Sequence, residues 1–511
     1  MTTMLPSRSP REVLARAEEL GLSLRSPAEE LTQRLAQDDA VLETLRSLDP
    51  ALVDHDPTQG RAALSVRDPA PTRTTRPPLF WRGEQPDPPA PATVADRRGP
   101  TWISVVDDPR VSPGGPLTGW EVGVKDLMAV EGCELTAGTR AHQGRTAAAD
   151  APAVAALRSA GATIRGTVNL HALAYGATGT SSDWGVPTNP AVAGAIPGGS
   201  SSGSAAAVAE GTAALALGTD TSGSIRIPAA LCGVVGLKPT RGLVSTQGCH
   251  PLSPTLDHIG PLGASVRPVA AAMSALAGWS GWRLPEEPEG TIRVGVLGGY
   301  FAEGVTAPVA TAFAHACEQL ERHGVELVPV ELPLARHVPG AQIALLGTEA
   351  LESNLETLRA RGGLLPADVR LRLEAGLART PEQYAVSRAL AARLRVQVDT
   401  ALELCHALIC PTTAITAPSP DTSHVEVDGA QVTVQFSLTR LTMPFNFSGH
   451  PALTLPLRDG WREDGAGEAG PGAREGERAR VAAPVGLQVI GRSGADQDLL
   501  ALSAHLEQIL T

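Results

Sequence analysis

Two short turns rich in serine and glycine carry the residues best suited to chemistry. The first reads GGSSSG from Gly198 to Gly203, and the second reads DTSGS from Asp220 to Ser224. Glycine allows backbone conformations and close approaches that other residues resist, so such turns can direct several N–H groups at one ligand atom. Each turn also offers a serine hydroxyl. Together the turns could supply a serine nucleophile and an oxyanion hole.

The segment between the two turns is mostly apolar. Residues 204–217 consist largely of Ala, Val, Leu and Gly, with Glu210 as the single charged residue. Strong helix formers with so few polar interruptions predict a buried helix. Residues 200–202 would then lie at its N-terminus, where unpaired backbone N–H groups and the helix dipole favour developing negative charge.

Lysine is nearly absent from the chain. Of the 42 basic residues only Lys125 and Lys238 are lysine. Arginine can replace lysine where a positive charge is enough, but its guanidinium stays protonated and cannot act as a neutral base. Lys125 is therefore a candidate general base. Lys238 stands before a proline in GLKPT, and we expect it to pack a turn through its aliphatic stem.

The composition limits the classes of function. At 511 residues, with 42% hydrophobic and 19% charged residues, the chain resembles a large soluble globular protein. Its net charge of −12 argues against a nucleic-acid partner, because phosphate binding needs clustered basic side chains. No signal peptide and no apolar run of about 18 residues occurs, so we expect a cytoplasmic protein that does not bind membranes. The six scattered cysteines predict free thiols and no metal site.

Two N-terminal segments carry the signature of a helix start. The sequences SPRE at residues 9–12 and SPAE at residues 26–29 each combine an N-cap serine, a proline at the first helical position and a capping-box glutamate. They predict helices of about 10 and about 20 residues. The proline-rich residues 68–116 predict an extended linker or surface segment. We therefore expect residues 1–115 to form a helical and proline-rich extension.

Helix and strand patterns alternate along the rest of the chain. The predicted strands cover residues 102–106, 122–124, 163–168, 234–237, 292–297, 325–331, 407–410, 452–457 and 485–490. The predicted helices cover residues 151–160, 306–323, 341–406 and 495–509. This alternation predicts an α/β fold around a mostly buried β-sheet. Residues 458–484 are rich in Gly, Glu and Arg, which favours a mobile loop exposed to solvent.

Several motifs taken together resemble the amidase signature family. They are GVKD ending at Asp126, the first Ser/Gly turn, GTDTSGSIRIPA at residues 218–229 around the second turn, GLKPTRG at residues 236–242, and the C-terminal PFNFSGHPALTLP and GLQVIG. The resemblance is dense over residues 120–265 and thinner over the last hundred residues. It implies a large mixed sheet covered by helices on both faces.

The resemblance also implies how the chain is divided. The amidase signature domain would span residues 116–511. Within it, the resemblance implies a cassette at 120–265, a variable helical region at 300–406, and return strands with a last helix at 407–511.

The resemblance further implies three catalytic residues. Ser224 would be the nucleophile, Lys125 the base, and Ser200 the serine between them, preceded by a cis peptide bond after Gly199. A lysine can act as the base when burial lowers its pKa toward neutrality, and Ser200 could relay the proton.

The backbone of the second turn would form the oxyanion hole. Its donors would be the N–H groups of Thr221, Ser222, Gly223 and Ser224, which would face the tetrahedral oxyanion. The family usually has glycine at the position of Ser222, so a side chain there could narrow the hole or add a hydroxyl contact. Two flanking residues, Asp220 and Arg226, are expected to brace the turn by hydrogen bonds.

Three functions remain open on the sequence. The first is a free-standing amidase that hydrolyses a small-molecule amide without cofactor or metal, with a homodimer left open. The second is the A subunit of a glutamyl-tRNA amidotransferase, although motifs expected of it outside the shared cassette are not found. The third is an α/β-hydrolase esterase, because residues 199–203 match G-x-S-x-G with Ser201 as nucleophile and the adjacent Asp257 and His258 as partners. That elbow needs a strand directly before Gly199.

Overall fold

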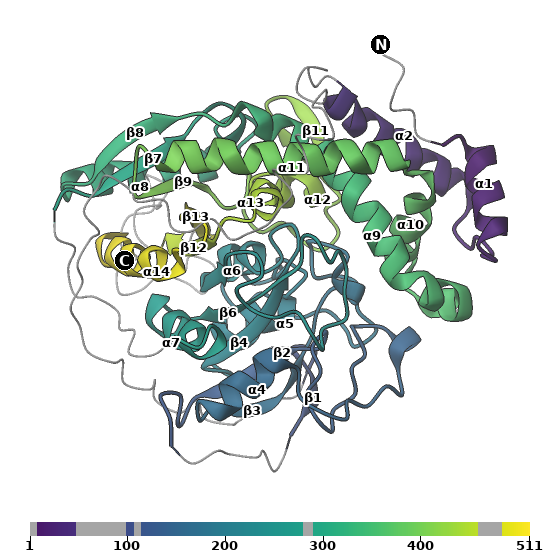
Figure 1. Ribbon diagram of the computed structural model, residues 1–511, viewed down its shortest axis with the longest axis horizontal. Coiled ribbons are helices and arrows are strands. Elements are labelled where there is room, and N and C mark those ends of the chain that lie inside the picture. Colours follow the sequence, from purple (N-terminus) through teal and green to yellow (C-terminus); the bar gives the residue numbers. More distant parts are fainter. Residues whose placement is uncertain (1–7, 47–98, 107–113, 280–289, 458–482, 511) are drawn as a thin grey trace, which may run out of the picture.

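The computed structural model describes residues 8–46, 99–106, 114–279, 290–457 and 483–510 (Figure 1). Most of the proline-rich stretch and of the loop predicted at 458–484 lies outside these residues. Within them, no helix is long and apolar enough to cross a membrane.

The described chain forms helices and strands in regular succession. The helices are α1 (Pro10–Glu19), α2 (Ala28–Arg46), α4 (Pro152–Ser159), α5 (Ser202–Ala209), α6 (Arg226–Cys232), α7 (Val266–Leu276), α8 (Ala307–Arg322), α9 (Val338–Arg361), α10 (Ala367–Ala375), α11 (Pro381–Leu402), α12 (Val434–Thr439), α13 (Met443–Ser448) and α14 (Asp496–Leu510). The strands are β1 (Trp102–Val105), β2 (Glu121–Lys125), β3 (Thr163–Val168), β4 (Leu215–Asp220), β5 (Val235–Lys238), β6 (His258–Gly263), β7 (Arg293–Leu297), β8 (Glu326–Val330), β9 (Ala407–Pro411), β10 (His424–Val427), β11 (Ala430–Thr433), β12 (Ala452–Leu457) and β13 (Val485–Ile490). A short 3₁₀ turn, η7 (Gly376–Ala378), follows α10.

One large mixed sheet organises these elements. It has eleven strands in the order β1-β3-β2-β4-β6-β5-β12-β13-β9-β7-β8, and β10 with β11 forms a separate hairpin. Strand β2 runs parallel to both β3 and β4, whereas β4 pairs antiparallel with β6. Because β2 and β4 are parallel neighbours, their C-terminal residues Lys125 and Asp220 come to the same edge of the sheet.

Helices cover both faces of the sheet, as the predicted α/β fold requires. Side chains alternate across a strand, and in β9 Ala407 and Ile409 join a core with α4, α7, α8 and α14. Leu408 and Cys410 of the same strand join a second core with α9, α11 and α13. Figure 1 shows α9 and α11 along one side of the molecule and α4 and α7 on the other. Apolar residues on both faces explain why the strands appear in the sequence as continuous apolar runs.

The N-terminal helices pack directly on the helical region. Val13 of α1 and Leu35 of α2 share a core with Leu358 of α9 and Leu373 of α10, and Figure 1 places α1 and α2 beside these two helices. The division of the chain at residues 115 and 116 stays a prediction.

The predicted buried helix over residues 204–217 is confirmed for residues 204–209 and wrong for the rest. Helix α5 ends at Ala209, Gly211 adopts a left-handed φ of +77°, and strand β4 begins at Leu215. The last apolar residues of the segment are buried on both faces of the central sheet, between β2 and β6. A fully buried strand and a buried helix have the same apolar composition, so the sequence pattern did not separate them.

The second predicted capping box is also wrong, whereas the first is confirmed. Ser9 caps α1 through a capping box with Glu12. Helix α2 begins only at Ala28, and the Ser26 hydroxyl has no hydrogen-bond partner among the described residues. The Glu374 carboxylate instead accepts from the backbone N–H of Ser26, so a contact from α10 takes the place of the predicted capping-box glutamate.

Candidate active site

Lys125 lies at the end of β2 and is completely buried. Its Nζ atom is 2.7 Å from Ser200 Oγ, 3.0 Å from Ser201 Oγ and 2.7 Å from Thr219 Oγ1. Among the described residues it forms no ion pair, and the neighbouring Asp126 carboxylate accepts hydrogen bonds from Thr136 instead. The amine is therefore surrounded by hydroxyl groups rather than carboxylates.

This environment changes the basicity of the amine. Burial lowers the pKa of Lys125 to about 7, against the smaller opposing effects of Cys249, Asp220 and Asp257. A large fraction of Lys125 is then neutral near pH 7, so it can accept a proton from a hydroxyl.

The first turn leads directly into α5. The peptide bond between Gly199 and Ser200 is cis, at the position that the resemblance implies. A Cβ atom at Gly199 would lie 2.7 Å from the backbone N of Gly179, so only glycine fits this close approach. Ser201 is the N-cap residue of α5, and its N–H donates to the Ser224 carbonyl at 3.1 Å. The two turns are thereby held together.

The second turn is braced by a buried ion pair, as predicted for Asp220 and Arg226. Both side chains are fully buried and lie 2.9 Å apart. Arg226 also donates to Asn446 Oδ1, to Gln488 Oε1 and to the Thr442 carbonyl. Burial alone would raise the pKa of Asp220, but the Arg226 charge and the hydrogen bonds from Arg226 and Asn446 outweigh it and keep the pKa below its ordinary value. The carboxylate stays ionised and fixes the turn.

The second turn departs from the expected oxyanion hole at one position. The N–H of Gly223 donates to Asp220 Oδ1 at 2.8 Å, so it is already used within the turn. Among the described residues, the N–H groups of Thr221, Ser222 and Ser224 have no hydrogen-bond partner.

Ser224 differs from the other two candidate residues in exposure. Ser224 is 7% exposed as a residue, whereas Lys125 and Ser200 are 0% exposed. Of the three, Ser224 is thus the residue that a ligand can reach.

The esterase alternative is wrong. Residues 190–199 contain no strand, and the Ser201 side chain is fully buried. His258 directs Nδ1 at the carbonyls of Leu256 and Asp220. Asp257 accepts from the Thr221 hydroxyl at 2.6 Å. The adjacent Asp257 and His258 therefore brace the second turn and do not serve Ser201.

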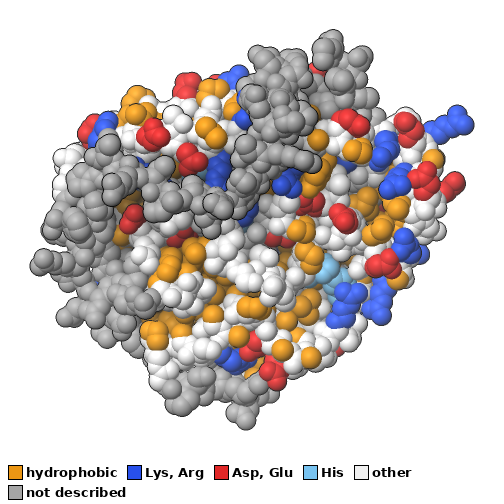
Figure 2. Space-filling model, in the orientation of Figure 1, with side chains coloured by type: hydrophobic (Ala, Val, Ile, Leu, Met, Phe, Trp, Pro, Cys, Tyr) orange, Lys and Arg blue, Asp and Glu red, His pale blue; other side chains and the backbone are white. Residues whose placement is uncertain are grey.

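The second lysine has a structural position, as expected. Lys238 Nζ donates to the carbonyl oxygens of His450 and Pro239. Both lysines of the chain are fully buried. The blue side chains on the face shown in Figure 2 are therefore all arginines, and acidic side chains are interspersed among them.

Comparison with known proteins identifies the family. The family model described as Amidase matches residues 105–500. The chain belongs to the amidase family. It is 34% identical to AtzE, one of the subunits of the 1-carboxybiuret hydrolase of Pseudomonas sp. (strain ADP), over 73% of this chain and 80% of that protein. It is 33% identical to the A subunit of the glutamyl-tRNA(Gln) amidotransferase of Symbiobacterium thermophilum (strain DSM 24528 / JCM 14929 / IAM 14863 / T), over 77% of this chain and 83% of that protein.

A solved amidase structure supports the same fold. It superposes with a TM-score of 0.69 at 36% identity, covering 78% of this chain and 86% of that one. Together with the family match, it identifies this amidase as a hydrolase of amide C–N bonds.

Several contacts around the turns of this amidase were not predicted. Thr219 is the third partner of Lys125, and Asn446 and Gln488 hold Arg226. All three lie inside the motifs that carry the resemblance to the amidase signature family. The resemblance was therefore the sequence signal that could have indicated them. Gln342 of α9, whose side chain contacts the Ser222 hydroxyl, lies in the variable helical region and had no signal.

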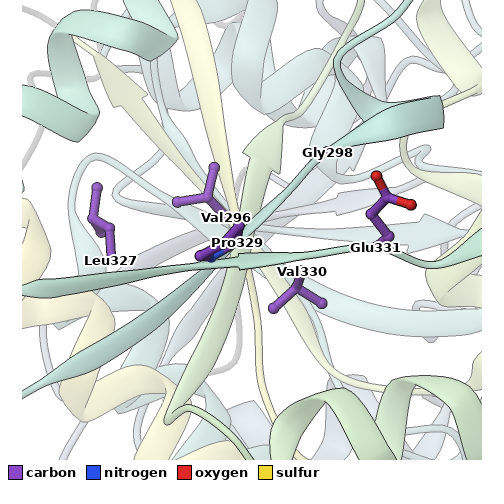
Figure 3. A pocket seen from close by; sticks show the side chains of 6 residues that line it. All are labelled: Val296, Gly298, Leu327, Pro329, Val330 and Glu331. Atoms are coloured by element: carbon purple, nitrogen blue, oxygen red, sulfur yellow. The ribbon is translucent and has the colours of Figure 1, made fainter.

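Three hollows in the described part of the amidase can be compared by the residues in their walls. One, of about 520 Å³, includes Ser222 of the second turn. A second, of about 390 Å³, lies on strands β7 and β8, with Val296, Leu327 and Glu331 in its wall (Figure 3). A third, of about 460 Å³, lies beside strand β1 and has Trp184 in its wall. The second and third contain none of the predicted site residues, so the first is the candidate substrate pocket.

Removing Arg226 should destabilise the amidase strongly. We expect Arg226→Met to lower the free energy of unfolding by about 3–5 kcal/mol, because it leaves the buried Asp220 carboxylate unpaired. Chemical denaturation measures this loss. Arg322→Met on α8 is the matched control, since Arg322 is 63% exposed and its pair with Glu318 contributes less than about 0.5 kcal/mol. Equal stability of the two variants would contradict the bracing role of the ion pair.

Proposed function

We propose that this chain is a free-standing amidase that hydrolyses a carboxylic amide through an acyl-Ser224 intermediate. The single observation that carries the proposal is the contact between Ser200 and a buried lysine whose pKa is lowered to about 7. In this proposal Lys125 is the general base, Ser200 relays the proton and Ser224 is the nucleophile.

The proposed reaction has two halves. Neutral Lys125 takes the proton of Ser200, which takes the proton of Ser224, and Ser224 Oγ attacks the amide carbon. The C–N bond then breaks, and the proton held by Lys125 returns through Ser200 to the departing nitrogen. In the second half a water molecule, deprotonated along the same route, attacks the acyl carbon. The bond between this carbon and Ser224 Oγ then breaks, the proton held by Lys125 returns through Ser200 to Ser224 Oγ, and the acid leaves and ionises to a carboxylate. Ammonia or an amine and a carboxylate are the products.

The oxyanion of each tetrahedral intermediate would be bound by backbone N–H groups of the second turn. Thr221, Ser222 and Ser224 supply donors that are unpaired within the described residues, and each such donor stabilises the transition state by roughly 3 kcal/mol. Gly223 would contribute only if its bond to Asp220 were released. The buried pair of Asp220 and Arg226 supports the proposal because it holds these donors in place before substrate arrives.

The purified chain alone should release ammonia from simple amides. The test is a panel of aliphatic, aromatic, peptide-like and urea-derived amides, assayed without a partner protein, ATP or added metal. We expect hydrolysis of at least one class, because the proposed base, relay and nucleophile all belong to this chain. No turnover of any amide would contradict the proposal.

A second candidate is the A subunit of an amidotransferase. It is favoured by the 33% identity to that component of a glutamyl-tRNA(Gln) amidotransferase. Such a protein would pass ammonia to its partner. The same assay separates the two functions, because a free-standing amidase releases ammonia at full rate alone, whereas an amidotransferase component would act on glutamine and depend on its partner.

A further inference from the structure

The cavity beside Ser222 combines parts of the chain that are far apart in sequence. Its wall includes Ser222 of the second turn, Gln342 of α9 and Arg379, which follows η7. It also includes Arg34 and Asp38 of α2. Helix α2 lies outside the region that the family model matches, which begins at residue 105. The pocket is therefore shaped in part by a helix that precedes the matched region.

Positive charge exceeds negative charge in this wall. Three arginines, Arg34, Arg372 and Arg379, face a single lining carboxylate, Asp38. Arg34 Nε donates to one oxygen of Asp38 at 2.8 Å, and Arg379 Nη2 donates to the other. Arg372 is paired with Asp368 at 3.0 Å. Among the residues that line the cavity, two guanidinium groups share one carboxylate, so positive charge exceeds negative charge in the wall by about one. Asp39 also acts on Arg379 but is not part of the cavity wall.

Two polar atoms of the cavity wall are buried without a partner. The Arg379 side chain is only 2% exposed, and its Nη1 atom makes no hydrogen bond in the described part of the chain. Gln342 Oε1 is likewise buried and unpaired there, while the other end of the same amide contacts the Ser222 hydroxyl. Buried polar groups in folded proteins nearly always have partners, so a missing partner at a ligand cavity points to a ligand.

We propose that this cavity binds a carboxylate group of the substrate, so that the preferred substrates are amides carrying a free carboxylate apart from the scissile bond. This inference rests on the proposed amidase function. Arg379 Nη1 donates a charge-assisted hydrogen bond to the carboxylate, and Gln342 Oε1 accepts an N–H of the substrate close to Ser222. One free donor and one excess charge match a singly charged carboxylate, whereas a phosphate would need more of both.

The first test uses the wild-type chain and two substrates of equal length. Glutaramate and pentanamide share a five-carbon chain and a primary amide and differ by a terminal carboxylate in place of a methyl group. We expect kcat/KM to be roughly 10- to 100-fold higher for glutaramate, the discrimination that one buried hydrogen bond to a charged group provides. A second pair with one more carbon, adipamate and hexanamide, tests a carboxylate that binds farther from the scissile amide. Equal or better hydrolysis of the neutral amide in both pairs would overturn the inference.

The second test changes the arginine. Arg379→Lys keeps a cation beside Asp38, so the ion pair with α2 is retained. The same change removes the guanidinium group and with it the unpaired Nη1 donor. We expect the preference for glutaramate over pentanamide to shrink by about tenfold, mainly through a higher KM for glutaramate. Arg322→Lys, an exposed position on α8, is the matched control and should leave the preference unchanged. If Arg379→Lys lowered kcat/KM equally for both substrates, Arg379 would be structural only and the inference would be wrong.

A binding measurement separates this inference from the proposed function. Calorimetry on the Ser224→Ala variant reports binding without turnover. If the wild-type chain hydrolysed no amide while Ser224→Ala bound glutaramate but not pentanamide, the proposed function would fail and the carboxylate site would stand. If the wild type hydrolysed pentanamide and Ser224→Ala bound both compounds equally, the function would stand and the carboxylate site would fail.

Discussion

Ser224→Ala is expected to abolish formation of the acyl-enzyme while leaving the fold intact. The change removes one oxygen from a turn that is held by the Asp220–Arg226 pair and by the Ser224 carbonyl, which the substitution does not alter. Removing the nucleophile should lower kcat/KM by roughly 10³-fold or more. A fluorophosphonate probe with mass spectrometry measures the acylation step, and chemical denaturation should show a free energy of unfolding within about 1 kcal/mol of wild type.

Ser201→Ala is the matched control for this experiment. It makes the same change at a serine of the first turn, which also lies 3.0 Å from Lys125 Nζ but is fully buried. We expect the probe to label this variant at Ser224. A covalent adduct on Ser201 in the wild-type chain would contradict the proposed nucleophile.

Most of the sheet was predictable from the sequence because its strands are buried on both faces. The ranges of β3, β12 and β13 match the predicted ranges. Strands β12 and β13 are short, mostly apolar runs, whereas β3 is marked by its β-branched residues. The pattern failed where composition is ambiguous, at the junction of α5 and β4. It also missed α6 and β6, because Pro228 interrupts the first and Gly260 with Pro261 interrupts the second.

The candidate site was predictable only in part. Lysine depletion and the family motifs selected Lys125, but 75 residues separate it from Ser200, and no local pattern brings them together. Their contact depends on the parallel pairing of β2 with β4 and on α5, which precedes β4 in the chain and carries the first turn at its N-terminus. The cavity beside Ser222 was beyond prediction for the same reason, since α2, α9 and the segment after α10 meet only in the folded chain.

Lys125→Arg is expected to fold normally and lose most of its activity. The guanidinium keeps the positive charge but cannot accept a proton at an accessible pH, so charge and base are separated by this one change. Loss of a general base lowers the rate by roughly 10²- to 10⁴-fold. The measurement is kcat/KM on the best amide of the panel, with Lys238→Arg as the matched control for placing the larger side chain at a buried position. Retention of more than about a tenth of the wild-type rate would mean that Lys125 only supplies charge.

The pH dependence tests the same lysine without a substitution. Only the neutral amine is a base, and burial lowers its pKa to about 7, so kcat/KM should fall as the pH decreases through about 7 and level off above it. Because the chain has only two lysines, labelling with ¹³C-lysine gives two Cε signals, and Lys125→Arg identifies the one from Lys125. That signal should titrate with the same midpoint as the kinetic profile. A Lys125 signal that titrates near the free-lysine value of about 10.4, while kcat/KM still falls near pH 7, would assign the base to another group.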